Sequence, residues 1–176
     1  MFEGSPMVND ELKQLAQTIG KNLAQRKLIL SFAESCTGGL ASAVITSIPG
    51  SSAWFDGGVV TYSNQAKQDL LQVRNETLVQ YGAVSEQTAA EMATGLLKQG
   101  RADITVSVTG IAGPDGGSAQ KPIGTVCFAW ASKNSVVKTR HFLFFGNREE
   151  IRQQSVRAML LGIKDFFVDT TDELKS

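Results

Sequence analysis

The chain has 176 residues, of which 42% are hydrophobic and 19% are charged, as is typical of a globular protein of one domain. Its 17 lysines and arginines balance 17 aspartates and glutamates. It therefore has no basic surplus with which to neutralise a nucleic acid or an anionic membrane surface, and we expect neither as a partner. No apolar run approaches the roughly 20 residues needed to cross a bilayer.

The two cysteines, Cys36 and Cys127, lie in no CxxC pair and beside no histidine cluster. This arrangement favours neither a metal site nor a disulfide framework. Free cysteines are typical of a reducing compartment, so we expect a cytoplasmic protein. Residues 1–8 are expected to be a flexible leader, residues 9–168 a single domain and residues 169–176 a flexible tail.

Helical and strand patterns alternate along the chain. In chain order we expect a helix after Asn9, a strand at 28–33, a helix at 37–48, a strand at 54–62, helices at 64–72 and 85–98 with a turn or short helix at 75–81 between them, a strand at 102–110, two strands at 123–132 and 135–145 joined by a tight turn, and a last helix through residue 167. The alternation, followed by a hairpin, predicts a three-layer α/β/α sandwich around a mixed, mostly parallel sheet.

The stretch AESCTGG, residues 33–39, leaves an expected buried strand and enters a helix. Open α/β sheets bind ligands just beyond the carboxyl ends of their strands, which is where Ser35 would lie. Amides of Thr37, Gly38 and Gly39 at the start of the helix would favour a phosphate or a developing oxyanion. Neither the GxxxxGK[ST] motif nor the GxSxG motif is present. A plain glycine turn with a serine cap is the alternative interpretation.

Lys67 lies in the first turn of the helix expected at 64–72, where the helix dipole favours the neutral amine. A neutral lysine can act as the general base for a serine nucleophile. The single histidine, His141, lies among phenylalanines in an expected strand and is interpreted as structural, which disfavours a Ser-His-Asp triad. A solvated surface lysine is the alternative interpretation of Lys67.

Two further stretches can contact a ligand. SVTGIAGPDGGS, residues 107–118, carries Thr109 at the end of an expected strand and then a glycine-rich loop, which lets backbone approach a ligand closely. A plain connection is the alternative, although loops of this length without secondary structure are often functional. Arg148 begins the last helix, where it can clamp a phosphate or carboxylate, or pair with a surface glutamate.

Together, AESCTGGLASAVITSIPGSSAWFDGGVVTYSN, YGAVSE and VTGIAGPDGGS resemble the CinA C-terminal domain family, the nicotinamide-nucleotide amidases (NMN deamidases), in its stand-alone form. The resemblance extends from about Leu12 to the last helix. It implies an α/β/α sandwich that hydrolyses nicotinamide mononucleotide to nicotinate mononucleotide and ammonia in NAD recycling. It also implies that no metal or other cofactor is required, and that the protein forms a homodimer or larger homo-oligomer.

The resemblance further implies a serine–lysine pair, in which Ser35 attacks the amide carbon and Lys67 takes its proton. Tyr62 and Thr109 match functional positions of the family and are expected to orient the substrate around the serine. Seven further positions are expected to contact the substrate or the oxyanion: Glu34, Thr37, Gly38, Gly39, Asn64, Gly110 and Arg148.

Some alternatives stay open on the sequence alone. The carboxylate of Glu34 can orient Lys67 or cap the turn locally. Cys36 has no predicted base and is expected to pack in the core. A non-catalytic module that binds or senses a pyridine nucleotide would use the same loops without turnover, and a related serine amidase would differ only in its substrate.

Overall fold

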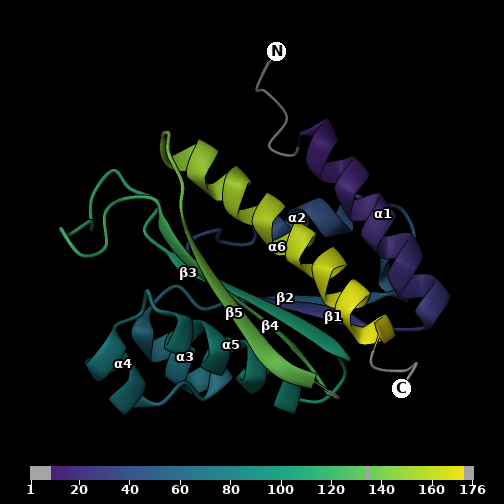
Figure 1. Cartoon of the computed structure of the whole chain (residues 1–176), viewed down its shortest axis with the longest axis horizontal. Coiled ribbons are helices and arrows are strands. Elements are labelled where there is room, and N and C mark those ends of the chain that lie inside the picture. The colour runs from purple at the N-terminus through teal and green to yellow at the C-terminus, as the bar shows by residue number, and fades with distance from the viewer. Residues whose placement is uncertain (1–8, 134, 173–176) are drawn as a thin grey trace.

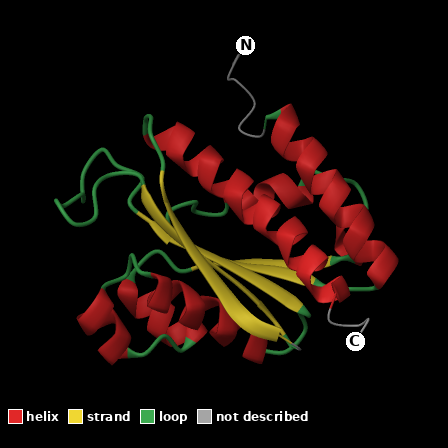
Figure 2. Ribbon diagram, in the orientation of Figure 1, coloured by secondary structure: helices red, strands yellow, loops and turns green. Residues whose placement is uncertain are grey.

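Within residues 9–133 and 135–172, which the computed structural model describes, five strands form one sheet between two layers of helices (Figure 1, Figure 2). In chain order the elements are α1 (Asp10–Arg26), β1 (Leu30–Glu34), α2 (Leu40–Thr46), a 3₁₀ turn (Ser51–Ala53), β2 (Phe55–Val60), α3 (Asn64–Leu71), α4 (Asn75–Tyr81), α5 (Glu86–Lys98), β3 (Ile104–Gly110), β4 (Thr125–Ser132), β5 (Ser135–Leu143) and α6 (Arg148–Asp172).

The strand order in the sheet is β2-β1-β3-β4-β5. β1 pairs in parallel with β2 and β3, whereas β4 runs antiparallel to both β3 and β5. Helices α1, α2 and α6 cover one face of the sheet, and α3, α4 and α5 cover the other (Figure 1). The predicted three-layer sandwich with a mixed, mostly parallel sheet is confirmed.

Side-chain caps fix where several helices begin, as the sequence predicts. Asn9 accepts a hydrogen bond from the Leu12 amide at 2.8 Å, and Ser63 and Ser85 cap α3 and α5 in the same way. At the start of α6, Asn147 and Glu150 exchange reciprocal backbone-to-side-chain hydrogen bonds. This is the geometry of a capping box.

Two helix boundaries differ from the predicted ones. α2 begins at Leu40 instead of residue 37, because Gly38 and Gly39 have φ values of 57° and 97°, which lie outside the right-handed helical region. α6 runs past residue 167 to Asp172, so residues 169–172 continue a helix where the sequence predicted a flexible tail. The expected leader at 1–8 and residues 173–176 lie outside the described residues.

The buried β3 strand separates two apolar layers. Phe32, Val106 and Phe128 belong to the larger cluster, which packs beneath α1, α2 and α6. On the α3–α5 side, Leu71 and Met92 form a smaller cluster with Ala33 of β1. Consecutive residues of β1 therefore face opposite layers, and all five residues of the strand are buried.

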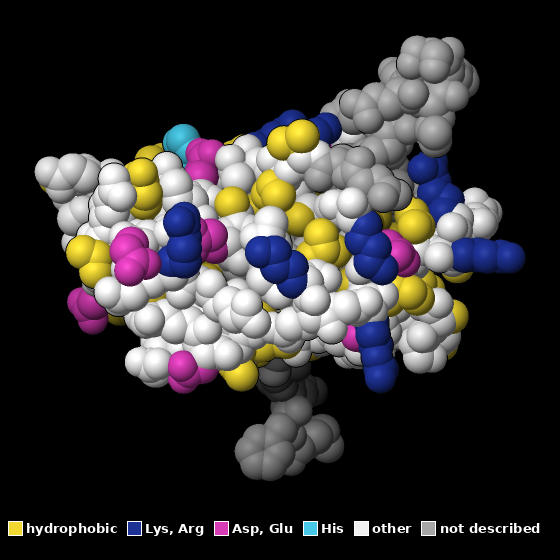
Figure 3. Space-filling view, turned by 90° about the horizontal axis from the view of Figure 1, so that it is seen from below, with side chains coloured by type: hydrophobic (Ala, Val, Ile, Leu, Met, Phe, Trp, Pro, Cys, Tyr) yellow, Lys and Arg dark blue, Asp and Glu magenta, His cyan; other side chains and the backbone are white. Residues whose placement is uncertain are grey.

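The surface of the α3–α5 layer is electrically mixed. On the face that Figure 3 shows, basic side chains are spread among polar and acidic ones and do not gather into one continuous patch. Within the described ranges, no helix combines the length and apolarity needed to span a bilayer.

Candidate active site

Ser35 lies at the carboxyl end of β1, next to the centre of the sheet. Its amide donates to the Val108 carbonyl at 3.0 Å, which extends the β1–β3 pairing by one residue. The chain then turns sharply, and the Gly38 amide donates to the Ser35 carbonyl at 3.0 Å. The serine is therefore presented at the sheet edge where α/β proteins bind ligands, as predicted.

Lys67 reaches Ser35 from α3 and is 1% exposed. Its Nζ donates to Ser35 Oγ at 2.9 Å and to the Thr61 carbonyl at 2.7 Å. Desolvation by burial lowers the pKa of the amine from 10.5 to about 8, and the Cys36 thiol acts in the opposite direction. The surface-lysine interpretation is therefore wrong, and burial dominates over the helix dipole that the sequence suggested as the cause of the lowered pKa.

A cavity of about 250 Å³ opens beside this pair. It brings together Ser35, Tyr62, Asn64, Lys67, Thr109, Gly110 and Arg148, all of which the sequence predicted as site residues. They come from the ends of β1, β2 and β3 and from the starts of α3 and α6. The remaining lining residues are Cys36, Ala83, Val84, Ile111, Ala112, Gly113, Asp115 and Gly116.

Arg148 ties two walls of this cavity together. Its guanidinium donates to the Gly113 carbonyl at 2.6 Å and to the Tyr62 hydroxyl at 2.9 Å. A surface pair with a glutamate, the alternative interpretation of Arg148, is instead made one turn later, between Arg152 and Glu149 at 3.0 Å. Arg148 therefore joins the glycine-rich loop to the segment that precedes α3.

Thr109 holds a third wall in place. Its hydroxyl donates to the Ala83 carbonyl at 2.8 Å, so the end of β3 is fixed to the segment before α5. Ala83 and Val84, which lie in the YGAVSE stretch, also line the cavity, and the sequence does not predict a role for either. Asp115 was likewise missed as a single residue, although its loop was predicted to be functional.

Four predicted site residues do not line the cavity: Glu34, Thr37, Gly38 and Gly39. Glu34 is 0% exposed, and its carboxylate accepts hydrogen bonds from the Gly39 amide and the Thr37 hydroxyl. The predicted substrate contact by Glu34 is therefore wrong, and of the two open alternatives the local cap is the correct one. The prediction that the Gly38 and Gly39 amides hold an oxyanion is also wrong, because both donate to groups within the turn.

Two backbone N–H groups of the turn are not paired with a carbonyl within the described structure. Among the described residues, no carbonyl accepts from the backbone N–H groups of Cys36 and Thr37, and the Cys36 N–H interacts with its own thiol. The Cys36 thiol itself is buried, which raises its pKa to about 12. It is therefore protonated near neutral pH and packs in the core, as predicted.

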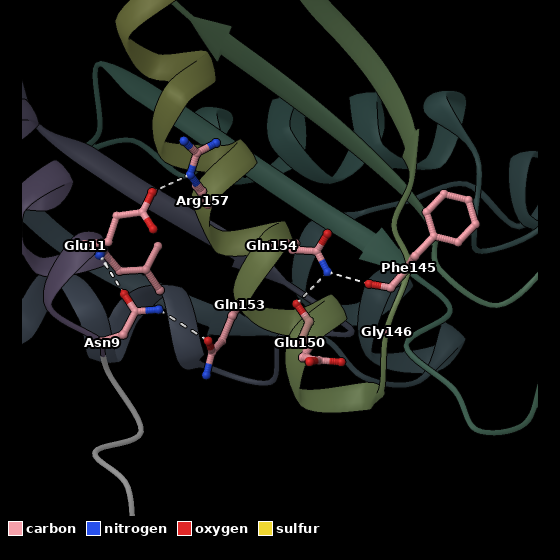
Figure 4. A pocket seen from close by; sticks show the side chains of 9 residues that line it. Asn9, Glu11, Phe145, Gly146, Glu150, Gln153, Gln154 and Arg157 are labelled. Carbon is pink, nitrogen blue, oxygen red and sulfur yellow. Dashed lines mark hydrogen bonds and ion pairs between the residues drawn. The ribbon is translucent and has the colours of Figure 1, made fainter.

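Other clusters lack this chemistry. His141 lies outside the cavity, with Nδ1 at 2.5 Å from Glu86 Oε1 on the surface. A larger depression of about 530 Å³ lies between α1 and α6, where Asn9 pairs with Gln153 and Arg157 pairs with Glu11 (Figure 4). Its lining holds no serine or lysine.

In the described part of the chain, no three His, Cys, Asp or Glu residues are grouped to hold a metal ion.

Comparisons with known proteins agree with this geometry. Residues 12–167 match the family model described as the CinA C-terminal domain. A protein of Escherichia coli (strain K12) named nicotinamide-nucleotide amidohydrolase PncC is 50% identical over 165 residues, which are 94% of this chain and 100% of that protein. Its counterpart in Enterobacter agglomerans is 52% identical, over 91% of this chain and 98% of that protein. The crystal structure of the competence/damage inducible protein CihA from Agrobacterium tumefaciens superposes with a TM-score of 0.88 at 45% identity, over 90% of this chain and 96% of that chain. Sequence and structure together establish that the chain belongs to the CinA C-terminal domain family.

Proposed function

We propose that this protein hydrolyses the carboxamide of nicotinamide mononucleotide, giving nicotinate mononucleotide and ammonia. The observation that carries the proposal is the 2.9 Å hydrogen bond between the buried Lys67 amine and Ser35 Oγ, at the wall of a cavity. Relatives named nicotinamide-nucleotide amidohydrolase match the whole site region at 50% identity. We further propose that the reaction serves NAD recycling in the cytoplasm.

In the first half of the reaction, neutral Lys67 takes the Ser35 hydroxyl proton as the oxygen attacks the carboxamide carbon. The amide of Cys36, which lines the cavity beside Ser35, is the candidate donor to the oxyanion of the tetrahedral intermediate. The Lys67 ammonium then gives its proton to the leaving nitrogen, so ammonia departs and an acyl-enzyme remains. The Thr61 carbonyl, at 2.7 Å, keeps the amine oriented throughout.

In the second half, a water molecule attacks the acyl carbon while Lys67 takes one of its protons. Collapse of this intermediate breaks the bond to Ser35 Oγ, which recovers its proton from Lys67 and releases the carboxylate product. No step needs a metal or an organic cofactor, because the lysine performs every proton transfer.

The walls of the cavity suit the rest of the nucleotide. Arg148 is exposed at the mouth and retains guanidinium N–H groups for the phosphate. Tyr62, Asn64, Thr109 and the Gly110 backbone are placed to orient the ring and ribose. Asp115 adds a carboxylate that can accept hydrogen bonds from ribose hydroxyls.

A homodimer or larger homo-oligomer is part of the proposal. β5 is an edge strand of the sheet, and it exposes Val136 and Leu143, with Phe145 just beyond its end. An exposed apolar edge strand can pair with another chain.

The test is to follow ammonia release from nicotinamide mononucleotide with a chelator present. Ser35→Ala and Lys67→Ala should both abolish turnover, whereas Ser52→Ala and Lys21→Ala, at exposed positions away from the cavity, should retain it. Turnover in Ser35→Ala would overturn the nucleophile assignment. Binding without turnover in the wild type would indicate the nucleotide-binding or sensing module, and hydrolysis of other amides only would indicate an amidase of different specificity.

A further inference from the structure

Glu34 is a buried carboxylate immediately before Ser35, and it is saturated with donors. Oε2 accepts from the Thr37 hydroxyl at 2.7 Å, the Gly39 amide at 3.0 Å and the Ala41 amide at 3.1 Å, and Oε1 accepts from the Ser42 amide at 2.9 Å and the Ser42 hydroxyl at 2.7 Å. Among the described residues, no Lys, Arg or His forms an ion pair with it. Its charge is instead balanced by the amides at the start of α2.

The backbone of Glu34 is held as firmly as its side chain. It lies in β1 opposite Val60 on one side and Val108 on the other, and its carbonyl accepts from the Thr61 amide at 2.8 Å. The carboxylate therefore connects the fixed centre of the sheet to the start of α2. The turn between these two anchors contains Ser35.

Residues of β2 and α6 surround the hydrogen bonds between Glu34 and the start of α2. A Cβ on Gly58 of β2 would lie 1.9 Å from Ser42 Oγ and 3.7 Å from Glu34 Oε1, so a side chain there would displace the Ser42 hydroxyl from its place beside Glu34. From the other side, Arg152 of α6 donates to the Thr37 carbonyl at 2.9 Å. The turn is thus bounded by β2, α2 and α6.

The direction of the carboxylate also matters for Lys67. No carboxylate in the described part of the chain lies within ion-pair distance of the Lys67 amine. If Glu34 turned toward Lys67, the ion pair would favour the ammonium, which cannot accept a proton from Ser35. The five hydrogen bonds described above instead hold the Glu34 carboxylate toward the start of α2.

We propose that Glu34 is a positioning residue, which fixes the turn at 35–39 so that Ser35 Oγ meets the Lys67 amine and Cys36 lines the cavity beside it. This inference rests on the proposed function, because it assumes that Ser35 is the nucleophile.

Glutamine cannot replace Glu34 in this setting. Its NH₂ group must stand where Oε1 receives the Ser42 amide, or where Oε2 receives the amides of Gly39 and Ala41. Either choice sets a donor against a backbone donor that cannot rotate away, so the turn must shift. A misplacement of about 1 Å at a nucleophile can cost on the order of 100-fold in rate.

The experiment compares Glu34→Gln with a matched control, Glu91→Gln. Glu91 also accepts four hydrogen bonds, from Arg74 and Thr77, but it does not line the cavity. For each variant we would measure kcat and KM for nicotinamide mononucleotide, the pH profile, the thermal midpoint, and the rate at which phenylmethylsulfonyl fluoride labels Ser35, read by mass spectrometry.

We expect Glu34→Gln to lower kcat by about 10- to 100-fold, to change KM by less than about threefold, to leave the pH midpoint in place and to slow Ser35 labelling in parallel with kcat. Glu91→Gln should lower the thermal midpoint and leave kcat and labelling unchanged. An unchanged kcat in folded Glu34→Gln would overturn the inference. A displaced pH midpoint would also overturn it, since Glu34 would then act on Lys67 directly.

Thr37→Val provides the test if Glu34→Gln does not fold, because it removes one donor and keeps the shape of the side chain. It should slow both kcat and labelling by about threefold, and unchanged values would overturn the inference. Labelling needs no substrate, so it separates the two proposals. If Ser35 is labelled but nicotinamide mononucleotide is not hydrolysed, the proposed function fails, and the labelling rates still decide the role of Glu34. If Ser35 of the wild type is not labelled, the positioning role of Glu34 fails as well.

Discussion

Replacing Lys67 with methionine should remove a pH dependence from the stability of the fold. Burial lowers the pKa of Lys67 from 10.5 to about 8. Below about pH 8 the amine is charged in both the folded and the unfolded chain, so the folded state carries the full cost of burying the charge. Between about pH 8 and 10.5 the folded protein has released the proton that the unfolded chain still holds, so the wild type gains stability as the pH rises.

The size of this effect follows from the two pKa values. Each unit corresponds to about 1.4 kcal/mol, so the lowered pKa represents about 3 kcal/mol at pH 7. By pH 9.5 about 2 kcal/mol of this cost should be gone. Methionine also gives up the hydrogen bonds to Ser35 and to the Thr61 carbonyl. That loss, about 1 kcal/mol for each bond, sets a constant offset between the two proteins and does not change with pH in the variant.

The assay is urea unfolding of the wild type and Lys67→Met at pH 7, 8, 9 and 9.5, with the free energy of unfolding extrapolated to water at each pH. Relative to the wild type, the variant should lose about 2 kcal/mol across this range. Lys21→Met is the control, since Lys21 is exposed on α1 and its removal changes no buried charge. A wild-type-to-variant difference that stays constant within about 0.5 kcal/mol would refute the assignment of a charge-excluding site to Lys67.

Three shorter predictions concern activity and packing. kcat/KM should rise about tenfold per pH unit below pH 8 and level off above it, because only neutral Lys67 is a base; a flat profile from pH 6 to 9 would contradict this. Arg148→Ala should raise KM for nicotinamide mononucleotide at least about tenfold and leave nicotinamide riboside nearly unaffected, whereas equal losses on both would show that Arg148 only supports Gly113. Thr61→Val should stabilise the protein by about 1 kcal/mol in urea unfolding, because Thr61 Oγ1 is buried without a hydrogen-bond partner in the described structure; a loss of stability would contradict this.

Most of the fold could be predicted because its signals are local. The caps at Asn9, Ser63 and Ser85 and the alternation of apolar strands with amphipathic helices each depend on a few neighbouring residues. The errors lie where tertiary structure decides. Gly38 and Gly39 have positive φ values, so α2 begins only at Leu40. α6 continues past Phe167 to Asp172, although the residues there are mostly polar.

The candidate site was predictable to the extent that topology gathers strand ends. Ser35, Tyr62 and Thr109 each follow or end a strand, and such ends meet at one edge of the sheet. The burial of Lys67 could not be predicted, because it depends on how α3 packs against β1. The helical pattern alone does not distinguish a buried lysine from a solvated one.

The direction of the Glu34 side chain also could not be predicted from the sequence. It determines which backbone amides are available to bind an anion. The sequence predicted an anion at the amides of Thr37, Gly38 and Gly39, which precede α2 in the structure. In the structure Glu34 occupies the Gly39, Ala41 and Ser42 amides, so the protein's own carboxylate takes the donors that a phosphate would use. Of the turn residues 35–39, only Ser35 and Cys36 line the cavity, so under the proposed function the Cys36 amide is the candidate donor to a small oxyanion beside the serine. Under the proposed function, the nucleotide phosphate would then bind elsewhere on the cavity wall, and Arg148 is the cationic side chain exposed at its mouth.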